Sequence, residues 1–227
     1  MGTKLDGIIA LDREYLFQNN GRLPVCFDRG EGSHLFDVDG KRYVDFFSGI
    51  AVSALGYAHP ALTRRLHEQV DKLIHSSNWY FNAQQAEAAK ALSAVSFKGK
   101  TFFANSGTEA NEAAIKLARR YGKSKDEEKF HIVSFLKSFH GRSYGSMSAT
   151  GQEKTRKGFD PLVPGFHYLP YGDLEALKEF LSKNKVCGVI MELIQGEGGI
   201  NVAKKEFVKG VESLCREHGA LMIIDEI

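Results

Sequence analysis

Four short stretches of this chain carry residue types that can hold a small molecule. The first, Ser106-Gly107-Thr108, follows the apolar run FFAN and opens an amphipathic segment. Ser106 and Glu109 have the spacing of a capping box, which predicts a helix start. Free backbone N–H groups, two hydroxyls and a glycine at a helix start can bind a phosphate group. A well-capped surface helix has the same pattern, so spacing alone leaves both interpretations open.

The neighbouring residues predict how this turn is positioned. We expect a strand over the run KTFFAN that ends at Asn105, followed by a helix over residues 108–121 that Gly122 terminates. The expected apolar face of this helix consists of Ala110, Ala113, Ala114, Leu117, Ala118 and Tyr121.

The second stretch is FHGR, residues 139–142, which also follows an apolar run. Phe139 and His140 offer flat rings, and the planar guanidinium of Arg142 suits a carboxylate. A loop arginine is more often simply solvated, so this stretch alone predicts little.

The third stretch is ELIQGEGG, which contains Glu192 and Glu197 after another apolar run. A carboxylate here could face a cationic group of a substrate or hold an arginine. In isolation, exposed acids in a glycine-rich loop are the simpler interpretation.

The fourth is Asp225, which ends the apolar run LMIID. A carboxylate at the end of a buried strand is costly unless it has a partner. A protonated ring nitrogen would be one partner, and a helix cap or an ion pair is the alternative.

The elements that must position these stretches form an α/β pattern. The apolar runs FHIVSF, VCGVIME and ALMIIDE alternate with expected helices at 108–121, 173–183 and 205–217. This alternation predicts a parallel sheet covered on both faces. Ligands of such sheets bind beyond the carboxyl ends of the strands, where all four stretches lie.

Residues 1–54 have a different pattern of apolar and polar residues. Alternating runs separated by Gly30-Glu31-Gly32 and Asp39-Gly40 predict a β-meander after a short helix at 6–17. Further on, Pro60 can open a helix, and another is expected at 83–96. We therefore predict an N-terminal segment at 1–54 and a larger domain at 55–227.

The composition limits the classes of protein to which the chain can belong. Of the 227 residues, 43% are hydrophobic and 26% charged, with a formal net charge of +2, which predicts no nucleic-acid or membrane partner. The isolated Cys26, Cys187 and Cys215 predict free thiols in a reducing cytoplasm, without a metal site. Gly99-Lys100-Thr101 is not a P-loop, because Ala94 replaces its first glycine and the stretch leads into an expected strand.

Taken in order, these motifs resemble the N-terminal portion of the class III aminotransferases, pyridoxal-phosphate enzymes of fold type I, and most of all the acetylornithine type. The matching stretches are GEGSHLFDVDGKRYVDFFSGIAVSALGYAHP, NSGTEANEAAIKLARRYG, SFHGRSYGSMSATGQEKTRKGFDPLVPGF, ELIQGEGGI and LMIIDEI. The resemblance implies a three-layer α/β/α large domain with a mainly parallel sheet, cofactor-binding and incomplete at its C-terminus. It also implies an N-terminal β-meander that contributes to a small domain.

The resemblance assigns the cofactor pyridoxal 5'-phosphate and a set of residues that bind it. Ser106, Gly107 and Thr108 would hold its phosphate, and Phe139 would stack on its pyridine ring. Asp225 would pair with the ring nitrogen and keep it protonated.

Other residues are assigned to the substrate. Arg142 would bind the substrate carboxylate, and Glu197 would lie near the distal end of the substrate, where it can neutralise a second arginine. Asn78 to Phe81 would help to wall the pocket.

The chain departs from the family pattern in two places. Leu193 stands where the family usually has proline. No lysine of this chain matches the one that forms the Schiff base, so we expect that catalytic residue beyond Ile227, together with a glutamine and a partner-subunit threonine. Because an open central strand rarely ends a sheet, we expect a fragment of a longer enzyme that is inactive and poorly folded alone.

The implied reaction moves the terminal amino group of N-acetylornithine to 2-oxoglutarate, giving glutamate, within arginine biosynthesis. Ornithine, succinylornithine, 4-aminobutyrate and carrier-bound lysine stay open as alternative donors, and a cytoplasmic homodimer is expected for the complete enzyme. A non-catalytic truncated paralogue is the alternative of another class, but the intact Arg142, Asp225 and phosphate turn argue against it. A generic phosphate-binding domain would not explain FHGR and QGEGG together.

Overall fold

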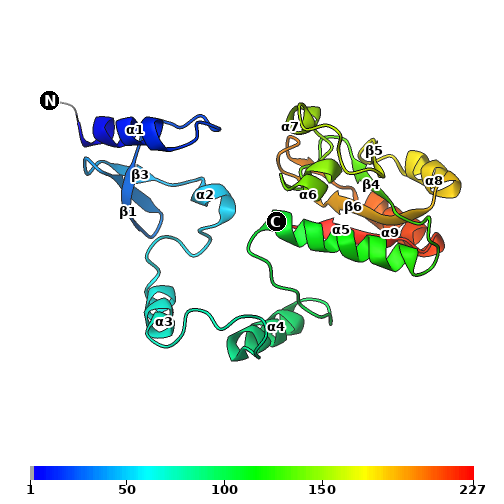
Figure 1. Ribbon diagram of the computed structural model, residues 1–227, viewed down its shortest axis with the longest axis horizontal. Coiled ribbons are helices and arrows are strands. Elements are labelled where there is room, and N and C mark those ends of the chain that lie inside the picture. Colours follow the sequence, from blue (N-terminus) through cyan, green and yellow to red (C-terminus); the bar gives the residue numbers. More distant parts are fainter. Residues whose placement is uncertain (1–2) are drawn as a thin grey trace. The chain divides into compact units, whose positions relative to one another are not determined.

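The computed structural model describes residues 3–227, which divide into two compact units between Ala88 and Ala89 (Figure 1). The predicted boundary at residue 54 falls inside the first unit, and the assignment of small and large domains stays a prediction. Residues 1 and 2 of the predicted N-terminal segment lie outside the described residues. In the part of the chain that the structure describes, no helix is long and apolar enough to cross a membrane.

The first unit contains the predicted short helix and β-meander. Helix α1 (Lys4–Tyr15) begins with a capping box between Thr3 and Asp6. Strands β1 (Phe27–Glu31), β2 (His34–Asp37) and β3 (Arg42–Val44) pair antiparallel in chain order. They are followed by the single turn α2 (Ser48–Ala51), by α3 (Pro60–Val70), which starts at the predicted proline, and by α4 (Ala83–Val95), which crosses the division.

Residues 3–110, which include the first unit and the approach to α5, contain no buried core. No residue between 3 and 110 is buried, and Phe46, Trp79 and Phe81 are almost fully exposed. Burial of apolar surface is the main favourable contribution to folding, so this part lacks what stabilises an independent domain.

The second unit is an α/β layer structure. Its elements are α5 (Gly107–Lys123), β4 (His131–Phe135), α6 (Tyr144–Ala149), α7 (Glu153–Arg156), β5 (Phe166–Leu169), α8 (Leu174–Lys183), β6 (Val186–Glu192), β7 (Ile194–Gln195), β8 (Asn201–Val202), α9 (Lys205–Glu217) and β9 (Leu221–Asp225). Four strands form a parallel sheet in the order β5-β4-β6-β9, which confirms the predicted α/β class, while β7 and β8 form a separate antiparallel pair.

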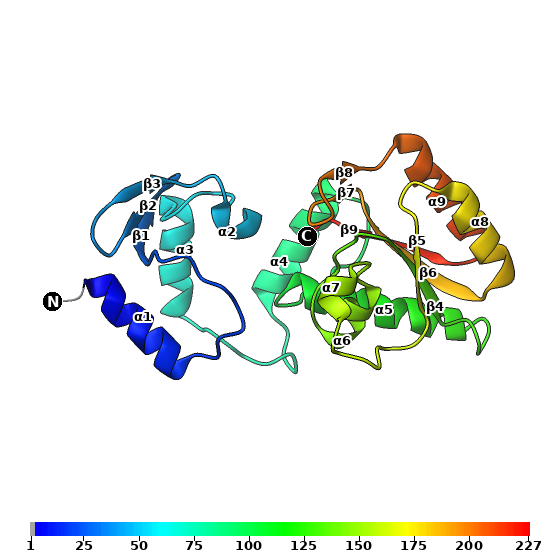
Figure 2. The ribbon, with the colours of Figure 1, turned by 90° about the horizontal axis from the view of Figure 1, so that it is seen from above.

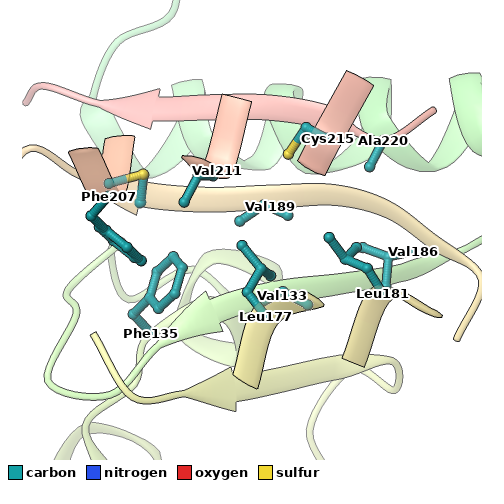
Figure 3. Close-up of a cluster of buried hydrophobic side chains, with 11 residues drawn as sticks. Val133, Phe135, Leu177, Leu181, Val186, Val189, Phe207, Val211, Cys215 and Ala220 are labelled. Atoms are coloured by element: carbon teal, nitrogen blue, oxygen red, sulfur yellow. The ribbon is translucent and has the colours of Figure 1, made fainter. Parts of the chain in front are cut away.

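Helices cover both faces of this sheet (Figure 2). On one face, side chains of α8 and α9 such as Leu177 and Phe207 pack against Val133 and Phe135 of β4 (Figure 3). On the other face, α5 packs against Ile132 and β6. The two buried clusters fix the strands and therefore the edge at which their carboxyl ends lie.

The structure confirms Ala118 on the predicted face of α5 and corrects the rest of that face. Its buried residues are Asn111, Ile115, Ala118 and Gly122, whereas Leu117 is 65% exposed. Small residues lie against the sheet because α5 approaches it closely: an added Cβ at Gly122 would lie only 2.5 Å from the Cβ of Cys187. Gly122 thus serves close packing, and the helix continues to Lys123.

The predicted strand over KTFFAN is also wrong. Residues 101–104 have no regular secondary structure, and Phe102 is 76% exposed. An apolar run becomes a strand only when a neighbour accepts its backbone hydrogen bonds, and no strand of residues 3–227 pairs with it. Conversely, β5 was not predicted, because His167 and Tyr168 interrupt its apolar pattern.

The corrected face of α5 can be tested by truncating neighbouring apolar residues. We expect Ile115→Ala to lower the free energy of unfolding by about 2–5 kcal/mol, because Ile115 is 3% exposed and its loss leaves a cavity. The control Leu117→Ala should change it by no more than about 0.5 kcal/mol. Urea denaturation followed by circular dichroism measures both, and a larger effect at Leu117 would contradict this packing.

Candidate active site

The carboxyl ends of β6 and β9 place two acids side by side. Glu192 and Asp225 are register partners on these neighbouring parallel strands. Glu192 is 8% and Asp225 9% exposed, so both carboxylates are largely withdrawn from water. The chain end lies beside the start of α5, where Ile227 contacts the position that a Cβ on Gly107 would take (Figure 1).

Asp225 is held by donors from two other elements. Its Oδ2 accepts hydrogen bonds from Asn111 Nδ2 of α5 and from His140 Nδ1, both at 2.8 Å. Its Oδ1 accepts the Ile227 N–H at 3.2 Å. Burial by itself raises the pKa of Asp225, but the bonds from His140 and Asn111 outweigh it and hold the pKa below the usual 3.8. Asp225 is therefore a fixed, ionised carboxylate.

Asn111 and His140 are the site residues whose roles sequence reasoning missed. Asn111 Nδ2 also donates to the backbone carbonyl of His140 at 2.8 Å, so one amide fixes both the acid and the loop. The available signal was its position four residues before Ile115, which places a polar side chain on a buried helix face. For His140 the signal was an imidazole ring in the loop that follows the buried strand β4.

The pKa of Glu192 is shifted in the opposite direction to that of Asp225. Its Oε2 accepts the backbone N–H of Phe139 at 3.2 Å. Burial raises the pKa of Glu192, and the nearby charge of Asp225 adds to the increase, while His140 and the Phe139 N–H act against it. The surroundings thus raise the pKa of Glu192 and lower the pKa of Asp225.

The FHGR loop is tightly held next to these acids. Phe139 is half-buried, and the His140 N–H donates to Thr150 Oγ1 at 2.9 Å. Gly141 has φ +119°, and a Cβ there would collide with Thr108 Oγ1, so only glycine fits. Arg142, next in sequence, is exposed and free to reach a ligand.

The start of α5 is capped almost as predicted. Ser106 is the N-cap and its Oγ accepts the Glu109 N–H at 3.4 Å. The Glu109 carboxylate, however, takes the N–H of Asn105 at 2.6 Å, so the capping box is reciprocal only in part. Among residues 3–227, nothing accepts the backbone N–H groups of Gly107 and Thr108, as expected of a helix start that can hold an anion.

Thr108 joins the start of α5 to the loop that carries Arg142. Its hydroxyl lies 2.5 Å from Ser146 Oγ and accepts the Ser143 N–H at 3.1 Å. Nearby, Glu112 Oε1 accepts the Ser146 N–H at 2.8 Å at the first turn of α6. The hydroxyl of Thr108 is therefore engaged with protein groups, which leaves its backbone N–H for an anion.

Glu197 is carried by the β7–β8 hairpin and is exposed. The buried Gln195 anchors the hairpin, because its Nε2 donates to the Leu136 carbonyl at 3.0 Å. Within the described part of the chain Glu197 and Arg142 form no ion pair. Asn78 to Phe81 belong to the first unit, where Trp79 and Phe81 are highly exposed.

These groups suit an anion and a protonated ring. Among residues 3–227, no cluster of three or more His, Cys, Asp or Glu side chains is placed to hold a metal ion. The start of α5 offers N–H donors to a phosphate. Asp225 Oδ1 carries a single, long hydrogen bond, so it can accept another from a ring N–H. Pyridoxal phosphate presents both features, so the residues fit it.

Comparison with known proteins gives a consistent picture. The family model described as Aminotransferase class-III matches residues 15–227. The chain is 52% identical to the acetylornithine aminotransferase of Aquifex aeolicus, covering 94% of this chain and 57% of that relative. It is 48% identical to that of Caldanaerobacter subterraneus subsp. tengcongensis, covering 97% of this chain and 56% of the relative. The chain thus spans about half the length of these relatives.

Solved structures that resemble this chain are also aminotransferases. The ornithine aminotransferase of Toxoplasma gondii ME49 has a TM-score of 0.91 at 29% identity, covering 98% of this chain and 53% of that one. Another structure of the Toxoplasma enzyme has partial occupancy of PLP at its active site. The N-acetylornithine aminotransferase of Stenotrophomonas maltophilia K279a has a TM-score of 0.79 at 36% identity, covering 96% and 53%.

The opposite pKa shifts predict opposite effects of neutralising the two acids. Asp225→Asn should lower the free energy of unfolding near neutral pH by about 1–3 kcal/mol, because charge-assisted hydrogen bonds are lost. The contribution of Asp225 is present above its unfolded pKa and is lost as the pH falls through its lowered folded value. The variant should therefore lose less stability than the parent below about pH 4.

Glu192→Gln is the matched variant. Its amide oxygen can still accept the Phe139 N–H, while the cost of a buried charge disappears. The folded pKa of Glu192 is raised, so its contribution is present at low pH and is lost as the pH rises. Near neutral pH the variant should be at least as stable as the parent. Urea denaturation over a pH series tests both, and equal losses at neutral pH would contradict this electrostatic picture.

Proposed function

Because the chain belongs to the class-III aminotransferase family, we propose that it forms part of a pyridoxal-phosphate-dependent acetylornithine aminotransferase. The proposed reaction moves the terminal amino group of N-acetylornithine to 2-oxoglutarate and gives glutamate, within arginine biosynthesis. The names of the curated relatives favour this amino donor. We also propose a cytoplasmic homodimer for the complete protein.

The observation that carries the proposal is the buried Asp225, whose Oδ2 accepts hydrogen bonds from Asn111 and His140. Pyridoxal phosphate, when bound, supplies an electron sink for the charge that develops on the carbon of the amino acid. Asp225 would hold a proton on the ring nitrogen, because an anionic acceptor next to that nitrogen favours its charged form. Asn111 and His140 keep the carboxylate in place for this purpose.

The other groups would orient the cofactor. The N–H groups at the start of α5, with Ser106, Gly107 and Thr108, would bind the phosphate. Phe139, whose backbone N–H is tied to Glu192, would present its ring to the face of the pyridine. Hydrogen bonds from the start of α5 would hold the phosphate, and the Asp225 carboxylate would hold the ring nitrogen.

Substrate recognition would use the exposed charged residues of the two loops. Arg142 offers a planar fork that can bind a carboxylate through two parallel hydrogen bonds. Glu197 would lie near the distal end of the substrate. The lysine that binds the cofactor is proposed to lie in the part of the relatives that this chain does not span.

A second amino donor deserves a direct comparison. The Toxoplasma structure with a TM-score of 0.91 is an ornithine aminotransferase, so ornithine is the main competing substrate. The deciding experiment reads the gene beyond codon 227 and assays the protein that it encodes with N-acetylornithine, ornithine, succinylornithine and 4-aminobutyrate. A higher kcat/KM for ornithine or another donor would overturn the substrate proposal. Absence of transamination with every donor would overturn the reaction.

The role of Arg142 predicts a kinetic effect in that protein. Arg142→Ala should raise KM for the amino donor by roughly ten- to a hundredfold, because a charge-assisted bidentate contact is lost. Arg142→Lys should recover only part of it, since an ammonium group lacks the planar fork. Arg120→Ala, at an exposed arginine of α5, is the control and should leave KM unchanged. An unchanged KM in Arg142→Ala would remove Arg142 from the substrate site.

A further inference from the structure

His140 combines full burial with a single polar contact of its ring. The residue is 1% exposed, and its Nδ1 lies 2.8 Å from Asp225 Oδ2. The other ring nitrogen, Nε2, is buried and has no hydrogen-bond partner within residues 3–227. The ring therefore serves Asp225 alone among the polar groups described.

The contact fixes which nitrogen carries the proton. An ionised carboxylate only accepts hydrogen bonds, so Nδ1 must be the donor to Asp225. Nε2 has no partner among residues 3–227, so the hydrogen bond between the ring and Asp225 runs through the Nδ1 proton.

Both polar groups of the His140 backbone are also held by hydrogen bonds. The His140 N–H is bound to Thr150 Oγ1, and the His140 carbonyl accepts from Asn111 Nδ2. Asn111 also donates to the same oxygen of Asp225 as the ring does. Both donors thus converge on Oδ2, and Oδ1 keeps only the 3.2 Å bond from the Ile227 N–H.

We propose that His140 is a positioning residue, which holds Asp225 ionised through Nδ1 and leaves Oδ1 for the ring nitrogen of the cofactor. This inference rests on the proposed function, because it assigns His140 a role toward the cofactor that Asp225 would contact. His140 itself would make no contact with the cofactor. Its effect is transmitted through the charge and the orientation of one carboxylate.

Two substitutions separate the hydrogen bond from the volume of the ring. In His140→Asn the amide Nδ2 can occupy nearly the position of the imidazole Nδ1 and can still donate to Asp225. His140→Leu fills a similar space without a donor. We expect the leucine variant of the complete protein to bind pyridoxal phosphate roughly tenfold or more weakly, and the asparagine variant within about threefold of the parent. Equal weakening of both variants, or of neither, would overturn the proposal.

A measurement on the parent protein keeps the test valid even if the leucine variant does not fold. Nitrogen-15 NMR of histidine-labelled protein should show a proton on Nδ1 of His140 at neutral pH. The His140→Asn variant identifies the signal by its disappearance. A ring with its proton on Nε2 and none on Nδ1 would overturn the proposal, whatever the binding data show.

Failure of the proposed function would look different. If the parent protein does not bind pyridoxal phosphate at all, the assignment of the cofactor fails, and with it the role of His140 toward the cofactor. The NMR signal would then still report whether His140 holds Asp225. If the parent binds the cofactor and the leucine variant binds it equally well, only the inference about His140 fails.

Discussion

A carboxylate that leaves water at the end of a parallel strand needs partners, and the second unit is arranged to supply them to Asp225. The side chain of Asp225 is 5% exposed, which would be unfavourable for an isolated charge. Its partners come from α5 and from the loop after β4. That requirement explains why α5 buries an asparagine on its sheet-facing side.

The same arrangement links the proposed cofactor site to the proposed substrate site. Asn111 ties α5 to the backbone of His140, and Thr108 ties the start of α5 to the backbone of Ser143, on either side of Arg142. A shift of α5 would therefore move both the phosphate-binding turn and the arginine. The chain spans about half of the relatives' length, and this half contains the residues that we propose to bind the cofactor phosphate, its ring nitrogen and the substrate carboxylate.

The sequence predicted the parts of this picture that local patterns determine. The helix start at Ser106, the parallel strands and the acid at the end of β9 all followed from caps, periodicity and apolar runs. Packing determined what was missed. Leu117 was predicted to face the core together with Ala118, but only Ala118 is buried, and the close approach of α5 to the sheet also buries Gly122. The pairing of Asn111 with Asp225 joins residues far apart in sequence, which no local pattern reveals.

The central claim is that Asp225 keeps the cofactor ring nitrogen protonated. Nitrogen-15 NMR of the complete protein with ring-labelled pyridoxal phosphate reports that protonation directly. We expect a protonated ring nitrogen in the parent protein at neutral pH and an unprotonated one in Asp225→Asn. An unprotonated nitrogen in the parent, or the same signal in both proteins, would contradict it.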